Sequence, residues 1–222
     1  SISVAGSKVK KKETMKISSM TTSLLVAVLA VPRPSTFVNG FMTGQQRSFY
    51  SRSRLLLGAA TTDTKLPIMA EEDVMAQKKH GTSEKPVMKD LRWNCDFQVA
   101  DRICNFNRHY AEYAGYWTTT EFLDDIKTRS NPEEPIEFFD SVTGELLFTA
   151  PIGRSMKDFI VESQSHGWPS FRDEEVNWDY VRCLKDGECV STTGTHLGHN
   201  LPDKSGNRYC INLVSVAGQK KE

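Results

Sequence analysis

Residues 194–215, GTHLGHNLPDKSGNRYCINLVS, combine a strand pattern with a dense set of reactive side chains. Both ends of the segment alternate apolar and polar side chains or carry β-branched residues, which is typical of β-strands. Two histidines, an aspartate, an arginine and a cysteine lie between His196 and Cys210. These residue types are compatible with a metal site, an activated thiol, or a core strand with polar neighbours.

The rest of the chain predicts further strands and a few short helices. Apolar Met156, Phe159 and Ile160 are spaced i, i+3, i+4 and predict a short helix over residues 155–166. Two more short helices are expected within residues 101–127, where threonines precede an acidic first turn. The predicted body is therefore mainly β with small helices, as an antiparallel sheet or open barrel. Its expected strands lie in 135–151 (a strand pair with a turn at Thr143 and Gly144), 177–184, 187–199 and 208–218, with a turn at 185–187.

The net charge of zero over 222 residues hides a division of the chain. Residues 1–60 carry nine Lys or Arg and one acid, a balance of +8, and the rest carry 19 basic and 27 acidic side chains, a balance of −8. The acidic body argues against nucleic-acid binding, which needs clustered Lys and Arg. We expect a targeting presequence over 1–60, a polar linker over 61–92 and a folded domain over 93–218.

The basic leader has the order of a targeting signal. LLVAVLAV at 24–31 is an apolar run ended by Pro32, and it is much shorter than the roughly 20 residues that span a bilayer. Residues 32–60 then hold four arginines and no acid. This order resembles the bipartite plastid presequence of diatoms and related algae. The resemblance implies a plastid location, with the secretory pathway as the alternative, and no membrane span in the mature form.

The five cysteines do not form a recognisable metal-binding or disulfide framework. No CxxC pair occurs, and Cys183 and Cys189 are too far apart in sequence for the usual zinc clamp, although His196 and His199 offer two ligands. An odd number of cysteines also excludes complete pairing. We therefore expect no metal and no bound cofactor, and a reactive role for one or two thiols.

Cys210 has polar neighbours at strand spacing. Arg208 and Asn212 lie two residues to either side, so in a strand their side chains share one face with the thiol. A neighbouring cation raises the thiolate fraction of a cysteine. His196, His199 and Asp203 can converge nearby, and histidine is the usual proton carrier near neutral pH. The same face is also compatible with a polar strand edge.

Several motifs in order resemble B-type methionine sulfoxide reductases. They are HLGH with Asp203, GNRYCIN around Cys210, GWPSF at 167–171, FFDSVTGELLF at 138–148 and, more loosely, AEYAGYW at 111–117. The resemblance covers roughly residues 100–217. It implies a β-tent of two antiparallel sheets with short peripheral helices. It also implies repair of the R epimer of methionine sulfoxide, free or in oxidised proteins.

The resemblance also implies roles for individual residues. Cys210 would attack the sulfoxide and become a sulfenic acid, with Arg208 supporting its thiolate and Asn212 positioning groups beside it. The remaining implied roles are protonation of the sulfoxide oxygen by His196, His199 and Asp203, and substrate binding by Trp168 and Phe171. The implied reductant is an external thiol of the thioredoxin or glutathione/glutaredoxin type, acting on a monomer.

Three departures from the family pattern affect metal binding, recycling and pocket polarity. His166 replaces the resolving cysteine before GWPSF, so Cys104, Cys183, Cys189 or an external thiol must resolve the sulfenic acid. Leu213 replaces the serine after CIN. A divergent subfamily is indicated, with a non-catalytic β-tent that binds a small ligand as the alternative. The zinc cysteines of many members are replaced by Asp140, Thr143, Val190 and Thr193, which resembles the zinc-free branch.

Overall fold

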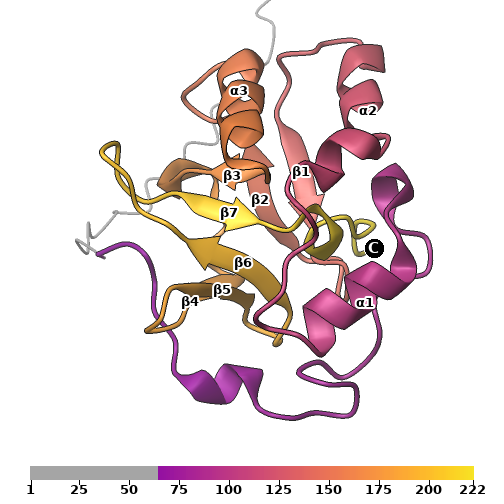
Figure 1. Ribbon diagram of the computed structural model, residues 1–222, viewed down its shortest axis with the longest axis vertical. Coiled ribbons are helices and arrows are strands. Elements are labelled where there is room, and N and C mark those ends of the chain that lie inside the picture. The colour runs from indigo at the N-terminus through magenta and orange to yellow at the C-terminus, as the bar shows by residue number, and fades with distance from the viewer. Residues whose placement is uncertain (1–64) are drawn as a thin grey trace, which may run out of the picture. The chain divides into compact units, whose positions relative to one another are not determined.

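The computed structural model describes residues 65–222, which belong to one compact unit (Figure 1). The targeting presequence expected over residues 1–60, with its signal core and transit-like segment, lies outside the described residues. The plastid location therefore stays a prediction. Within residues 65–222, none of the helices has both the length and the apolar character needed to cross a bilayer.

Two antiparallel sheets form the body, which confirms the predicted mainly β fold. The larger sheet has five strands in the order β3-β7-β6-β5-β4, and the smaller is the hairpin β1-β2 (Figure 1). Within each strand, successive side chains point to opposite faces of the sheet. The strands are β1 Ile136–Phe139, β2 Leu146–Ala150, β3 Ser170–Phe171, β4 Val181–Cys183, β5 Glu188–Ser191, β6 His196–Asn200 and β7 Tyr209–Ile211.

The third of the three α-helices lies where the periodicity predicts it, whereas the first begins four residues before the expected range 101–127. They are α1 Phe97–Asn105, α2 Phe122–Thr128 and α3 Met156–His166. The side chains of Asp96 and Ser155 accept hydrogen bonds from backbone N–H groups in the first turns of α1 and α3, so both helices begin with a polar cap. Gly167 ends α3 at a φ of 91°, a conformation that glycine adopts without strain. Short 3₁₀ turns occur at Glu72–Met75, Arg92–Asn94, Tyr116–Thr119, Asp173–Glu175 and Leu213–Ser215.

Three of the expected strands are shorter than the pattern predicts, and the strand expected over 177–184 is reduced to Val181–Cys183. Residues 187–199 form two strands separated by a turn, and residues 208–218 remain in the sheet only over Tyr209–Ile211. The chain then turns because the backbone N–H groups of Leu213 and Val214 donate to the carboxylate of Glu112, at 2.6 and 3.1 Å. β3 was not predicted, since two residues carry no readable period.

An aromatic core joins both sheets and α3. The ring of Phe171 on β3 stacks on Phe148 of β2, with 4.4 Å between centroids, and meets Phe138 of β1 and Phe159 of α3 edge-on or tilted. All four side chains are fully buried. Each buried phenylalanine stabilises the fold by about 1.5–3 kcal/mol, so this cluster fixes β3, and with it the start of the site.

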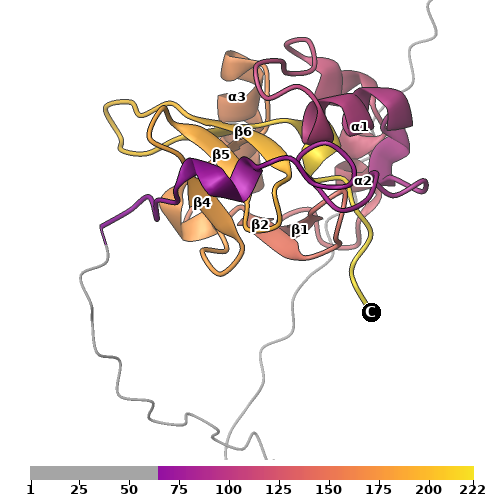
Figure 2. The same ribbon diagram turned by 90° about the horizontal axis from the view of Figure 1, so that it is seen from below.

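Residues 65–75 cover the outer edge of the five-stranded sheet (Figure 2). Ala70 N–H donates to the carbonyl of Cys183 and Cys183 N–H donates to Ile68, both at 2.9 Å. Met75 is buried against Leu184 and Val190. These bonds satisfy the exposed backbone of the edge strand β4. From residue 65 on, the expected linker over 61–92 is thus packed on the body, because a few apolar residues in a polar segment suffice to dock it.

Candidate active site

Strand register brings the predicted cysteine and histidines to one face of the larger sheet. Cys210 of β7 lies opposite His199 of β6 on one side and Ser170 of β3 on the other, and His199 lies opposite Glu188 of β5. Directly opposed residues of antiparallel strands project to the same face. Of these four residues, Cys210 and His199 border a cavity of about 300 Å³. Its lining residues are His109, Tyr110, Ala111, Trp168, His196, Gly198, His199, Leu201, Cys210 and Asn212.

The Cys210 thiol has a cation directly beside it. Arg208 Nη1 donates to Cys210 Sγ at 2.5 Å, and Ser170 Oγ lies 3.8 Å from the same sulfur. Cys210 is half-buried, whereas the other four cysteines are buried. A guanidinium is always charged, so this contact places a permanent cation beside an accessible sulfur.

The buried carboxylate of Glu188 is hydrogen-bonded to His196 and to Arg108. His196 Nδ1 lies 2.7 Å from Glu188 Oε1, and Arg108 donates to the same carboxylate through Nε and Nη2. Burial disfavours the ionised Glu188, but its hydrogen bonds to His196 and Arg108 prevail and lower its pKa. Burial and the neighbouring His196 lower the pKa of His199, whose ring centroid lies 5.7 Å from that of His196. His199 is therefore neutral near pH 7, and one of its ring nitrogens carries a proton.

Glu188 and Arg108 were not predicted as site residues. The sequence signal that could have indicated Glu188 is a glutamate in the buried strand β5, because a charged side chain there needs a partner. Arg108 lies in a loop and carries no pattern at all.

Trp168 and the chain after Cys210 are held by the same segment. Trp168 Nε1 donates to the carbonyl of Glu112 at 3.0 Å, while the carboxylate of Glu112 binds the N–H groups after Asn212. Burial raises the pKa of Glu112 to about 8, although the two backbone donors oppose the shift. Asn212 is anchored to the Leu197 carbonyl of β6 through its side chain, at 3.1 Å. Glu112 thus links both walls of the cavity, a role that the sequence did not reveal.

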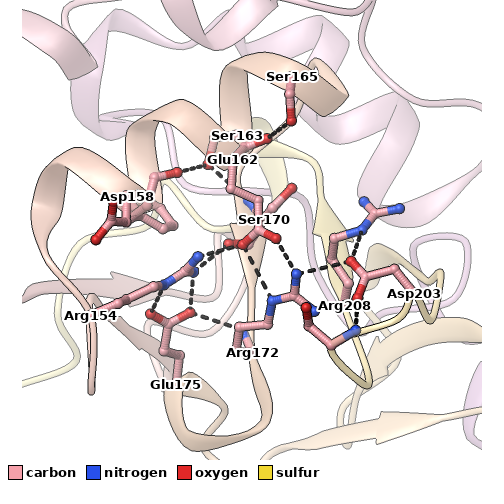
Figure 3. Close-up of polar contacts among 12 residues, drawn as sticks. Arg154, Asp158, Glu162, Ser163, Ser165, Ser170, Arg172, Glu175, Asp203 and Arg208 are labelled. Carbon is pink, nitrogen blue, oxygen red and sulfur yellow. Dashed lines mark hydrogen bonds and ion pairs between the residues drawn. The ribbon is translucent and has the colours of Figure 1, made fainter.

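Two expected site residues lie elsewhere. Phe171 follows Ser170 along β3, so it faces away from Cys210 and packs in the aromatic core. Asp203 lies in the turn between β6 and β7, where it pairs with Arg172 and with Arg208 rather than with the histidines (Figure 3). Hydrogen bonds from Arg172 lower the pKa of Asp203 to about 2. The Asp203 carboxylate thus faces the guanidinium groups of Arg172 and Arg208.

The three candidate resolving cysteines do not contact Cys210. Cys104 of α1 is buried with its Sγ 3.5 Å from Ser215 Oγ. Cys183 and Cys189 oppose each other across β4 and β5, with 3.4 Å between their sulfurs. Cys189 pairs with Gly198, one position along from the Cys210–His199 row, and so projects to the opposite face of the sheet. Burial raises the pKa of both Cys104 and Cys189, which makes them poor nucleophiles.

The four positions of the family's zinc cysteines hold a different cluster. Buried Asp140 accepts hydrogen bonds from Thr195 Oγ1 at 3.0 Å and from Val142 N–H at 2.8 Å, with Thr193 Oγ1 at 3.5 Å. Val190 packs instead in an apolar cluster. One carboxylate already bound by hydroxyl and amide donors does not match the thiolate and imidazole ligands of structural zinc.

A second group of metal-type donors lies at the edge of the site. Glu162, His166 and Asp203 each place one atom within 4.8 Å of the others. Arg172 binds both of these carboxylates, so the group is an ion-pair cluster.

Comparison with known proteins matches part of the chain. Peptide methionine sulfoxide reductase MsrB of Methanosarcina mazei is 40% identical over 67 residues, covering 25% of this chain and 47% of the relative. The proteins of the same name from Leifsonia xyli subsp. xyli and Methanosarcina barkeri are 37% and 39% identical over 68 and 67 residues, covering 48% and 46% of their lengths and again 25% of this chain.

The chain thus spans about half the length of the curated relatives that it matches. No family model and no solved structure matches it. The matched relatives share one name, and the mainly β fold agrees with the fold expected from the sequence motifs. The chain therefore contains a region of the peptide methionine sulfoxide reductase MsrB type.

Proposed function

We propose that this protein reduces methionine-R-sulfoxide to methionine through a thiol cycle on Cys210, and that it repairs oxidised proteins. The observation that carries the proposal is the half-buried Cys210 sulfur, held against Arg208 in a cavity that Trp168 and His199 also line. The shared name of the matched relatives supports the same reaction. No feature of the cavity favours a ligand-binding module without turnover.

In the proposed reaction the Cys210 thiolate attacks the sulfoxide sulfur. The sulfoxide oxygen takes up a proton and is transferred to the cysteine sulfur, so methionine leaves and Cys210 becomes a sulfenic acid. Cysteine is oxidised by two electrons and the sulfoxide is reduced by two. The proton comes from solvent and passes through His196 and His199, the histidine wall of the cavity. The neutral His199 donates its ring N–H to the oxygen while its other ring nitrogen takes up a proton, and Glu188 holds His196 Nδ1 so that Nε2 is left for proton exchange.

We propose that an external thiol of the thioredoxin or glutathione type resets Cys210 directly. Its sulfur condenses with the sulfenic acid and releases water, and a second thiol then cleaves the mixed disulfide. Two observations support this route. His166 stands before Gly167, and the buried Cys183 and Cys189 face the other side of the sheet.

Trp168 suits the methyl and sulfur of the substrate. Its indole is fixed by the Glu112 carbonyl, and sulfur–aromatic contacts contribute about 0.3–1.5 kcal/mol each. The remaining polar contacts come from the other polar side chains that line the cavity, which are His109, Tyr110, His196, His199 and Asn212.

The deciding experiment is NADPH-coupled reduction of R- and S-methionine sulfoxide with a thioredoxin or glutathione system. We expect turnover of the R epimer only, and none with Cys210→Ser, because oxygen has no acceptor sulfur. Cys104→Ser and the double change Cys183→Ser/Cys189→Ser serve as controls and should retain turnover with a direct thiol donor. Activity that survives Cys210→Ser, or no activity with any thiol donor, would contradict the proposal.

A further inference from the structure

Arg208 stands at the end of a chain of ion pairs that runs away from the cavity (Figure 3). Its Nη1 contacts the Cys210 sulfur, and its Nε lies 3.3 Å from Asp203 Oδ2. The Arg208 side chain is only 10% exposed. The carboxylate of Asp203 is thus an ion-pair partner of this guanidinium, and it acts through charge because the contact lacks hydrogen-bond geometry.

Asp203 cannot orient Arg208 without being held itself. It lies in an exposed turn, where its local bonds are to Gly206 and Ser205. Arg172 binds both of its carboxylate oxygens, at 3.2 and 2.9 Å, and also the Asn207 carbonyl at 3.1 Å. The planar fork of arginine suits this two-point contact, which fixes direction as well as distance.

Arg172 is anchored in turn to the rigid part of the fold. It follows β3, which pairs with β7 at Ser170 and Cys210, so its backbone keeps a set distance from the reactive sulfur. Its backbone N–H donates to Glu175 at 2.8 Å, and its guanidinium also binds Glu162 of α3. Glu162 and Glu175 are themselves bound by Arg154.

We propose that Arg172 is a positioning residue of the site, which holds Asp203 so that Arg208 stays against the Cys210 sulfur. The proposal rests on the proposed function only in taking Cys210 as the nucleophile. Asp203 forms ion pairs with both Arg172 and Arg208. Its one negative charge therefore does not fully balance the charge of Arg208, which still acts on the Cys210 sulfur. The other titratable groups around Cys210 are His196 and His199 of β6, Glu188 of β5 behind them, and His109 and Tyr110, which line the same cavity.

The experiment measures alkylation of Cys210 by iodoacetamide in the full chain, between about pH 5 and pH 9, with the modified peptide quantified by mass spectrometry. Arg172→Gln should slow the reaction by about threefold to tenfold near neutral pH and leave it unchanged at alkaline pH, because only the thiolate fraction changes. Arg172→Lys should behave like Arg172→Gln, since an ammonium keeps the charge but not the fork. Recovery of the wild-type profile by the lysine variant would overturn the positioning role.

A double change tests whether Arg172 acts through Arg208. Arg208→Gln alone should slow alkylation at least as much, and adding Arg172→Gln should change the rate by no more than about twofold. Fully additive losses would refute the proposal. Arg92→Gln is the matched control: Arg92 packs on Trp93 and bonds the Glu137 carbonyl, away from the site, so its loss should lower Tm but not the alkylation rate.

This readout needs no sulfoxide turnover. Absence of reductase activity with an intact Arg172 effect would count against the proposed function alone. Active enzyme with no Arg172 effect on the alkylation profile would count against the positioning role alone.

Discussion

Glu112 is a buried carboxyl whose protonation is coupled to folding. Burial raises its pKa to about 8 in the folded protein, from an ordinary value of 4.5. Between these values the folded state holds a proton that the unfolded chain has released. The stability that this group contributes is complete below about pH 4.5 and is lost as the pH rises through about 8.

Glu112→Gln should therefore flatten the pH dependence of unfolding. The loss of stability between pH 5 and pH 8 should be smaller than in the wild type by up to about 1.4 kcal/mol per pH unit. Urea unfolding at a series of pH values measures it. Glu134→Gln makes the same change at an exposed carboxyl and should leave the slope unaltered. Equal slopes in all three proteins would show that Glu112 does not titrate in this range.

Trp168 has a separable polar contribution. Trp168→Phe keeps an aromatic face but loses the N–H donated to the Glu112 carbonyl. The lost hydrogen bond is worth about 1 kcal/mol, so we expect kcat/KM for methionine-R-sulfoxide to fall by about fivefold or more. Steady-state kinetics check this, and Trp178→Phe, whose indole bonds the Asp173 carbonyl, is the control. Equal losses in the two variants would show that the hydrogen bond of Trp168 has no specific effect on catalysis.

Among the elements, the turn of the β1-β2 hairpin is joined to the turn between β5 and β6. Asp140 lies in the first, Thr193 and Thr195 lie in the second, and the hydroxyl groups of both threonines donate to the Asp140 carboxylate. The family pattern marks Asp140 and Thr193 as replacements of zinc cysteines, but Thr195 lies outside that pattern. Thr195 contributes because the folded turn brings its hydroxyl to the Asp140 carboxylate, and the sequence does not predict which hydroxyl of the turn does so.

Thr195→Val should therefore destabilise the fold by about 1–3 kcal/mol, because it removes a donor from a buried carboxylate. Thr192→Val, at an exposed position of the same turn, should change the stability by less than about 0.5 kcal/mol. The urea midpoints of the two variants give the comparison. A neutral Thr195→Val would mean that the cluster does not tie the turns together.

At the scale of the whole molecule, period and motif order predicted the strands other than β3, the helices α2 and α3, and the convergence of Cys210 with His196 and His199. They did not predict register between distant strands. Phe171 and Asp203 belong to the motifs and were expected at the site. In the structure Phe171 faces the core and Asp203 faces Arg172. Side-chain direction along β3 and charge pairing across the β6–β7 turn decide both, and each depends on neighbours far away in the chain.

The cover over β4 yields a prediction about the boundaries of the folded unit. A chain beginning at residue 93, where the aromatic body starts, loses the backbone bonds to Cys183 and the buried Met75 and Val87. An uncovered sheet edge promotes association. We expect that chain to have a lower Tm and to elute as aggregates in size-exclusion chromatography, whereas a chain beginning at residue 65 elutes as one species. Identical behaviour of the two chains would show that the cover is dispensable.

The burial of four cysteines beside one half-buried cysteine has a practical consequence. A maleimide dye should count a single thiol in the native protein and five after denaturation. The attached fluorophore would sit at the mouth of the cavity without any engineered residue. Its emission would then report whether the cavity is filled, and competition between dye and sulfoxide analogues would rank ligands before any turnover assay is available.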